Sequence, residues 1–194
     1  MPTSLRTFLK AEHGVAAIEF VFILPFMVFL FFGMVDLTQL IGSNRKVTQS
    51  ASIVADLVAQ NRNTMIKSQI NDYYKAVEMI LAPMPTAEMR IEVRGFRPNA
   101  ARTAVTQLWS TGNGMGPSCG AMPTTTSMVP LVEAGNDLII ARVCVEYEPF
   151  LATFMGKQIL GDTNFLVEET IILRPRSTNT LTCYNTVVNG AVCS

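Results

Sequence analysis

The chain has a single histidine, His13, and its 15 basic and 15 acidic residues cancel. Because His13 precedes a long apolar run, the rest of the chain offers no imidazole for a catalytic triad, a zinc site or a general base. The balanced charge leaves no basic excess for binding nucleic acid. We therefore expect no nucleic-acid partner, no metal and no cofactor.

Phosphate-binding and nucleophile motifs are also missing, because the sequence has no Gly-x-x-x-x-Gly-Lys, no Gly-x-Gly-x-x-Gly and no Gly-x-Ser-x-Gly. The acidic pairs that remain are Glu146 with Glu148 and Glu168 with Glu169. Two carboxylates can hydrolyse glycosides, but charges on one strand face usually meet solvent. The sequence favours a structural protein over an enzyme, with an envelope-anchored hydrolase as an alternative that these pairs leave open.

Residues 15–35 form an apolar run in which Glu19 is the only ionisable residue. At about 1.5 Å per residue, a helix of this length spans roughly 30 Å, enough to cross the hydrocarbon core of a membrane. The run is long for a signal peptide, and no Ala-x-Ala site closes it. We expect a retained transmembrane helix that crosses a lipid bilayer once.

Glu19 is costly in that setting, because an ionised side chain in a bilayer costs on the order of 3 kcal/mol even on lenient insertion scales. One interpretation is that assembly with other chains supplies a partner for this carboxylate. The alternative is that Glu19 lies near the lipid headgroups and reaches water.

All four cysteines follow the apolar run, and none forms the Cys-x-x-Cys pair typical of a zinc site. The even set indicates an oxidising compartment for this part of the chain, with four free thiols in a cytosolic domain as the alternative. Cys183 and Cys193 bracket a short polar loop in a tail with little apolar content, so we expect them to form a disulfide. Cys119 with Cys144 follows by elimination.

Helical periodicity continues beyond the apolar run, in a stripe with spacings of four, three and four residues: Val47, Ala51, Val54 and Val58. We expect the membrane helix to continue as a stem, loosened near residues 42–44. A second amphipathic helix follows the interruption at 61–64 and is ended by Pro83 and Pro85. Stem and second helix together cover residues 36–82.

The period changes to two at Met89, Ile91 and Val93, which alternate with charged residues as in a half-buried strand. Three further elements continue the head: a partner strand at 103–109, a nearly continuous apolar central strand at 138–147 and a last strand at 164–173. Residues 110–130 read as a long loop, and 150–156 as a short helical turn. The predicted fold class is α+β: a transmembrane helix that continues as a helical stem, then a small antiparallel sheet domain over 83–194 with a disulfide-tied C-terminal tail.

The N-terminal residues resemble those of type IV pilins, in which a short basic leader ends in glycine and a glutamate is the fifth residue of the mature chain. Here Gly14 ends the leader, Val15 follows it, and Glu19 is the fifth residue. The closer likeness is to TadE-like proteins, minor pilins or pseudopilins of tight-adherence (Tad, or Flp) pili, whose opening segment is similar to 14–20 followed by Leu24-Pro25-Phe26 and Gly33. Residues 143–147 also resemble a central strand of that family.

The resemblance implies that a prepilin peptidase removes residues 1–14 by cutting between Gly14 and Val15. It also implies a bacterial inner-membrane protein with a cytoplasmic N-terminus and a periplasmic head, whose partners are other pilins and the Tad assembly platform. Glu19 of one subunit would pair with the Val15 ammonium of its neighbour, and Pro25 would kink or locally melt the helix. The implied function is to initiate or assemble pili for surface adherence; an uncleaved envelope scaffold resembling TadG-like proteins is the alternative.

Overall fold

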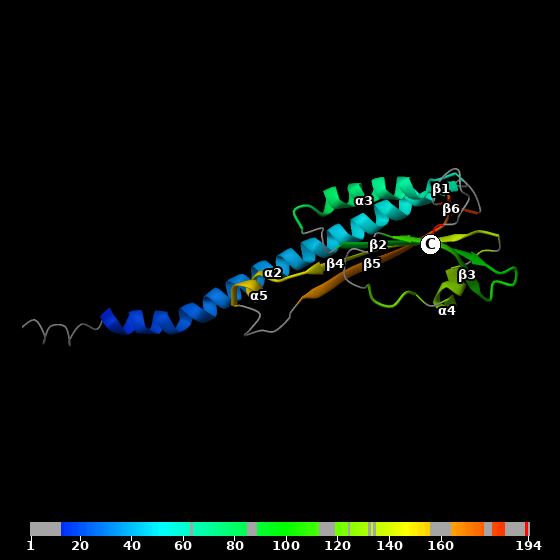
Figure 1. The fold of residues 1–194 in the computed structure, drawn as a ribbon. Helices are drawn as coiled ribbons and strands as arrows, with labels where there is room; N and C mark the ends of the chain where they lie inside the picture. The colour runs from blue at the N-terminus through cyan, green and yellow to red at the C-terminus, as the bar shows by residue number, and fades with distance from the viewer. Residues whose placement is uncertain are drawn as a thin grey trace, which may run out of the picture.

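A computed structural model of the chain describes residues 13–62, 64–84, 89–112, 119–123, 125–131, 133, 135–155, 164–176, 180–184 and 193. Its longest element is the helix α2, His13–Ala59. Figure 1 shows that the N-terminal part of α2 projects from the molecule as a free arm, while its C-terminal part lies along a β-sheet. The expected α+β fold, with a long apolar helix packed on an antiparallel sheet, is confirmed.

The two parts of α2 differ in burial. Every side chain from 16 to 31 is exposed, whereas the predicted stripe is fully buried: Val47, Ala51, Val54 and Val58. The expected loosening near residues 42–44 is wrong, because α2 continues through them without a break. A glycine in a helix costs about 1 kcal/mol relative to alanine, and the burial of Ser43 and Val47 against the head stabilises the helical conformation there.

The head contains a four-stranded antiparallel sheet with the order β3-β2-β4-β5. Its strands are β2 (Met89–Pro98), β3 (Val105–Gly112), β4 (Leu138–Tyr147) and β5 (Phe165–Leu173). The apolar β4 pairs with a strand on each side, so its predicted central position is confirmed. The predicted alternation in β2 is also confirmed, because Met89, Ile91 and Val93 are buried and the residues between them are half-buried.

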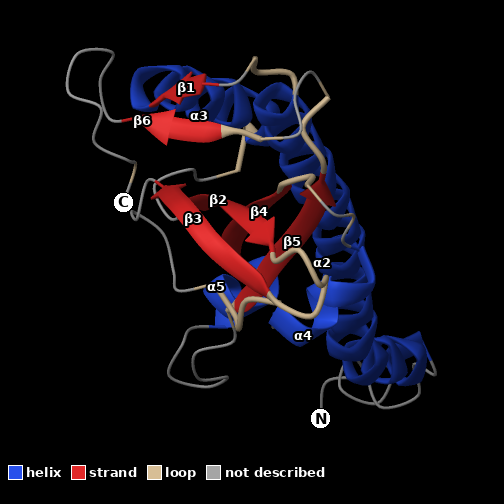
Figure 2. Cartoon of the chain, turned by 90° about the vertical axis from the view of Figure 1, so that its right-hand side faces the viewer, coloured by secondary structure: helices blue, strands red, loops and turns tan. Residues whose placement is uncertain are grey.

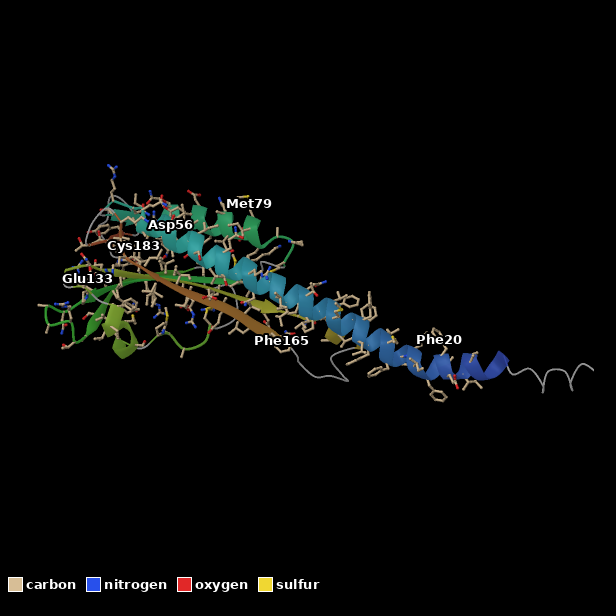
Figure 3. All side chains as sticks on the ribbon, turned by 180° about the vertical axis from the view of Figure 1, so that it is seen from behind. Phe20, Asp56, Met79, Glu133, Phe165 and Cys183 are labelled. Atoms are coloured by element: carbon tan, nitrogen blue, oxygen red, sulfur yellow. A yellow bond between two sulfur atoms is a disulfide. The ribbon has the colours of Figure 1, made fainter. Side chains whose placement is uncertain are left out.

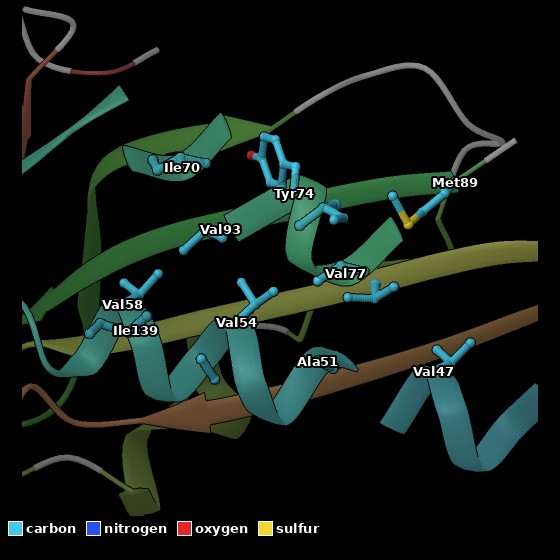
Figure 4. Close-up of a cluster of buried hydrophobic side chains, with 14 of the residues drawn as sticks. Val47, Ala51, Val54, Val58, Ile70, Tyr74, Val77, Met89, Val93 and Ile139 are labelled. Carbon is cyan, nitrogen blue, oxygen red and sulfur yellow. The ribbon is translucent and has the colours of Figure 1, made fainter. Parts of the chain in front are cut away.

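The main core lies between one face of this sheet and two helices. The buried stripe of α2 packs over β4 and β5, and the second helix, α3 (Lys67–Leu81), packs beside α2. Figure 4 shows Val54 and Val58 of α2 close to Val77 and Tyr74 of α3 and to Val93 and Ile139 of the sheet. A smaller cluster covers the other face, with Met128 packed against residues of three strands: Phe96, Val105, Leu138 and Ile140.

Sequence periodicity did not predict a second, two-stranded sheet. Strand β1 (Thr64–Ile66) pairs in parallel with β6 (Thr182–Tyr184), and Figure 2 shows this pair beside α3 and apart from the larger sheet. The expected disulfide between Cys183 and Cys193 is confirmed. Closing a loop of about ten residues stabilises a fold by roughly 2 to 3 kcal/mol in the chain-entropy picture, which compensates for the few apolar residues of the tail.

The predicted long loop at 110–130 is wrong in part. Strand β3 extends to Gly112, and the helix α4 (Thr125–Met128) and the 3-10 helix η2 (Val129–Leu131) follow within the same stretch. The disulfide between Cys119 and Cys144 ties this segment to the central strand, as elimination had indicated. The predicted helical turn after β4 is present as α5 (Phe150–Met155).

Gly95 of β2 leaves room for the indole ring of Trp109 on β3, which lies where a Cβ atom at this position would be. The ring is held in place, because its Nε1 donates a hydrogen bond of 2.9 Å to the carbonyl oxygen of Leu181. Trp109 therefore connects the edge of the sheet to the C-terminal tail.

We predict that Gly95→Ala destabilises the head by about 1 to 3 kcal/mol, because the added methyl group overpacks the core against Trp109. Gly42→Ala is the matched control: no atom lies within 4 Å of a Cβ at this helical position, so we expect up to about 1 kcal/mol of stabilisation. Guanidinium unfolding of the full chain in detergent, followed by the fluorescence of Trp109, measures both. Equal midpoints for Gly95→Ala and the wild type would contradict the prediction.

Candidate assembly surface: the apolar arm and its junction with the head

The arm of α2, residues 16–35, presents apolar side chains in every direction. Its large exposed residues include Ile18, Phe20, Phe22, Phe26 and Met27. Figure 3 shows side chains on more than one side of this part of the helix, with Phe20 near its free end. A helix that is apolar on all sides is stable only when lipid or other helices surround it. The arm satisfies the length and composition criteria for one membrane span, and its hydrophobic window has no buried residue in the structure.

Glu19, the single ionisable residue of the apolar run, is exposed on this arm. Among the described residues it has no hydrogen-bond or ion-pair partner. Gly14 and Val15 lie in the first turn of α2, but their side chains and residues 1–12 are outside the described part of the chain. The role of each of these three residues therefore remains a prediction.

Pro25 lies inside α2 and does not interrupt it. The sequence predicts a kink or local melting at Pro25; the helix is not melted there, and Figure 1 shows the first, dark-blue part of α2 turned away from the course of the remainder. A proline removes one helix hydrogen bond and its ring crowds the carbonyl of the preceding turn, so bending without unfolding is the usual result.

The arm meets the head at Asp36, the first buried side chain of the described chain. Its two carboxylate oxygens accept hydrogen bonds of 2.8 Å each, from the backbone N–H groups of Phe150 and Leu151 at the start of α5. The hydroxyl of Tyr147 donates to the carbonyl oxygen of Asp36 at 3.3 Å. The aromatic rings of Phe32 and Phe150 lie next to this point, with centroids 5.4 Å apart.

Asp36 acts as an N-cap that one helix supplies to another. The free N–H groups at a helix start carry partial positive charge, and an aspartate is among the best groups to satisfy them. Burial, with a smaller effect from the Asp36 carboxylate, raises the pKa of Tyr147. The hydroxyl is protonated at neutral pH even at its ordinary pKa of about 10, and this shift extends its role as a donor to higher pH. These contacts fix α5 and the end of β4 to the base of the arm.

The acidic pairs, which on the sequence alone are candidate catalytic carboxylates of a hydrolase, have structural partners. Glu146 accepts a hydrogen bond of 2.6 Å from the side-chain amide of Asn164. Glu168 forms an ion pair of 3.0 Å with the buried Arg142, and it also accepts a bond from the backbone N–H of Gly120. Glu169 accepts a hydrogen bond from Thr48 on α2. These acids hold loops and helices to the sheet, so the geometry gives no support to a catalytic pair.

Comparison with known families agrees with the N-terminal resemblance. Residues 14–56 match the model of the family described as TadE-like protein. The matched segment contains the arm, the Asp36 junction and most of the buried stripe of α2. No curated protein and no solved structure matches the chain significantly. The TadE-like character of this segment is confirmed, and the family suggests a component of Tad pilus assembly, a class of generally structural proteins.

We predict that Asp36→Ala weakens the attachment of α5 to the arm by about 1 kcal/mol, the usual cost of losing an N-cap. The amide hydrogens of Phe150 and Leu151 should then exchange faster with solvent. Asp72→Ala is the matched control, because it also removes an aspartate from a helix interior but from an exposed position on α3. Hydrogen exchange followed by mass spectrometry checks this; equal protection of residues 150–151 in both variants would show that Asp36 does not hold α5.

Proposed function

We propose that this protein is a minor pilin or pseudopilin that helps to initiate or assemble Tad pili used for surface adherence. The observation that carries the proposal is the arm, an apolar helix that is exposed at every residue from 16 to 31, projects from a folded head and lies within the TadE-like segment. Such an arm needs lipid around it before assembly and other helices around it after assembly. The same surface thus serves storage in the membrane and packing in a filament.

The proposed topology places residues 1–14 in the bacterial cytoplasm, 15–35 in the inner membrane, and the stem and head (36–82 and 83–194) in the periplasm. The two disulfides support this orientation, because such bonds form and persist in the periplasm and are rare in the cytosol. The partners in this setting are a prepilin peptidase, other pilins, the Tad assembly platform and the bilayer itself.

Glu19 has a defined task in this proposal. Cleavage after Gly14 creates an ammonium group on Val15, one helical turn before Glu19. When arms of neighbouring subunits pack together, the Glu19 carboxylate of one subunit pairs with the Val15 ammonium of the next, and each charge offsets the desolvation cost of the other. The exposure of Glu19 in the single chain is consistent with a partner that only assembly provides.

An uncleaved envelope scaffold of the same apparatus, resembling TadG-like proteins, is the second candidate. It is consistent with the same arm and the same head, but it keeps residues 1–14 throughout its life. The mass of the mature protein separates the two candidates, because only the pilin loses these residues.

We predict that cells with the cognate prepilin peptidase cut the chain after Gly14, and that Gly14→Trp blocks the cut because a large side chain obstructs the approach of the protease. Gly33→Trp is the control, since it places the same bulk on the arm beyond the cleavage point, where no atom lies within 4 Å of an added Cβ. N-terminal sequencing of protein from membranes and from sheared pili reports the cut. A wild-type protein that retains Met1 in both fractions supports the scaffold candidate instead.

We predict that Glu19→Gln leaves membrane insertion and cleavage intact but reduces incorporation into pili. The Val15 ammonium then lacks its counter-charge in the packed arms, and an unpaired buried ion costs several kcal/mol. Glu78→Gln, at an exposed position on α3, makes the same chemical change outside the arm. Sheared pili and attached cells are counted after processing has been confirmed by mass. Wild-type values for Glu19→Gln would show that Glu19 only faces the headgroups.

A further inference from the structure

The end of the head nearest the arm carries a group of exposed apolar side chains that the assembly proposal does not use. Phe150 at the start of α5 is 47% exposed, and Phe165 and Leu166 at the start of β5 are 50% and 42% exposed. We call these three residues the apolar shoulder. Figure 3 shows Phe165 at the arm-facing end of the sheet, where the head gives way to the bare helix.

The height of the shoulder relative to the arm follows from its contacts. The ring of Phe150 packs against that of Phe32, which lies three residues before the end of the apolar run at Val35. At about 1.5 Å per residue, Phe150 is therefore level with a point roughly 4 to 5 Å inside the membrane-length segment.

Phe165 is placed by the sheet register. It pairs directly with Tyr147, whose hydroxyl bonds to Asp36 at the end of the arm. Neighbouring strands lie about 4.8 Å apart, so Phe165 is at nearly the same height as Tyr147. Leu166 is one residue further from the arm, or about 3.3 Å. The three shoulder residues thus share one level close to the end of the arm.

The shoulder is also held at this level. The Asp36 carboxylate binds two N–H groups of α5, and α2 continues from the arm into the core without a break. Whenever the arm lies in a bilayer, the shoulder must meet the boundary between headgroups and acyl chains. Exposed Phe and Leu side chains are favourable there, and interfacial helices insert their apolar faces about 5 to 10 Å into that layer.

We propose that the apolar shoulder is a lipid-contacting surface that seats the head on the outer face of the bilayer. The proposal rests on the assignment of residues 15–35 as a membrane span. The lipid boundary is the occupant that continuity with the arm requires, because the shoulder cannot leave this level while Asp36 and Phe32 hold α5 against α2. The seated head is fixed in height, and α5 lies in the interfacial layer rather than in bulk water.

The test uses tryptophan as a depth probe in the full chain, reconstituted into phosphatidylcholine vesicles whose acyl chains are brominated either near the headgroup or near the bilayer centre. Phe150→Trp places a probe on the shoulder at α5, and Phe165→Trp places a second one on β5. Leu131→Trp is the matched control, because Leu131 is 46% exposed and its carbonyl oxygen accepts a bond from Arg174, beyond the opposite end of β5. The native Trp109 is buried and provides a constant background.

We expect bromine near the headgroup to remove most of the fluorescence added by Phe150→Trp and Phe165→Trp, and to leave that of Leu131→Trp unchanged. Phe22→Trp, on the exposed arm, tests the underlying span separately, because bromine at the bilayer centre should quench it. If Phe22→Trp is quenched while both shoulder probes behave like Leu131→Trp, the shoulder proposal is overturned and the span stands. If Phe22→Trp is not quenched, the span itself fails, and the shoulder proposal fails with it.

A second copy of this chain is the competing occupant of the shoulder. In that case the shoulder probes stay unquenched in dilute vesicles, and their emission shifts to the blue only as the ratio of protein to lipid increases. That result overturns the lipid assignment. Quenching that is independent of the ratio of protein to lipid supports it.

Discussion

The continuity of α2 forces one helix to satisfy two environments. From 16 to 31 every side chain faces outward, and from Val47 to Val58 an apolar stripe is buried against the sheet. The first part is stable only when lipid or other helices surround it. The second part is stable because it packs against the head, whose other surfaces face water. The rest of the architecture follows from the change between them. Asp36 marks that change, because it is the first buried side chain and it binds the head to the helix at that point.

Much of the fold could be predicted because it depends on local periodicity. The spacing of Val47 to Val58, the alternation of Met89, Ile91 and Val93, and the continuous apolar run of β4 each report a single element and its buried face. The pair β1–β6 could not be found this way, because strands of three residues contain too few positions to show a period and their pairing joins positions more than a hundred residues apart. The loosening expected near Gly42 failed for a related reason: tertiary packing outweighs a local propensity of about 1 kcal/mol.

For the candidate assembly surface too, features of consecutive residues could be predicted from the sequence, and contacts between distant residues could not. The arm and the spacing of Gly14 to Glu19 are read directly from the sequence, since they involve consecutive residues and a recognisable motif. Asp36 was missed because its partners are backbone N–H groups 114 and 115 residues away, and backbone donors leave no mark on sequence composition. The acidic pairs could be identified in the sequence, but the residues that they contact could not. Only the fold shows that Arg142, Thr48 and Asn164 engage these carboxylates.

The unbroken course of α2 also determines how the molecule carries mechanical load. Figure 1 shows that the helix and the strands of the sheet run along the same long axis, so a pull on the arm acts along the face where α2 meets β4 and β5. To yield, the helix must slide past the sheet and displace the whole buried stripe together, because no linker stands between arm and core to extend first. Strands β1 and β6 lie at the end of the molecule opposite the arm. A pull on the arm is therefore resisted by the whole buried interface between α2 and the sheet at once.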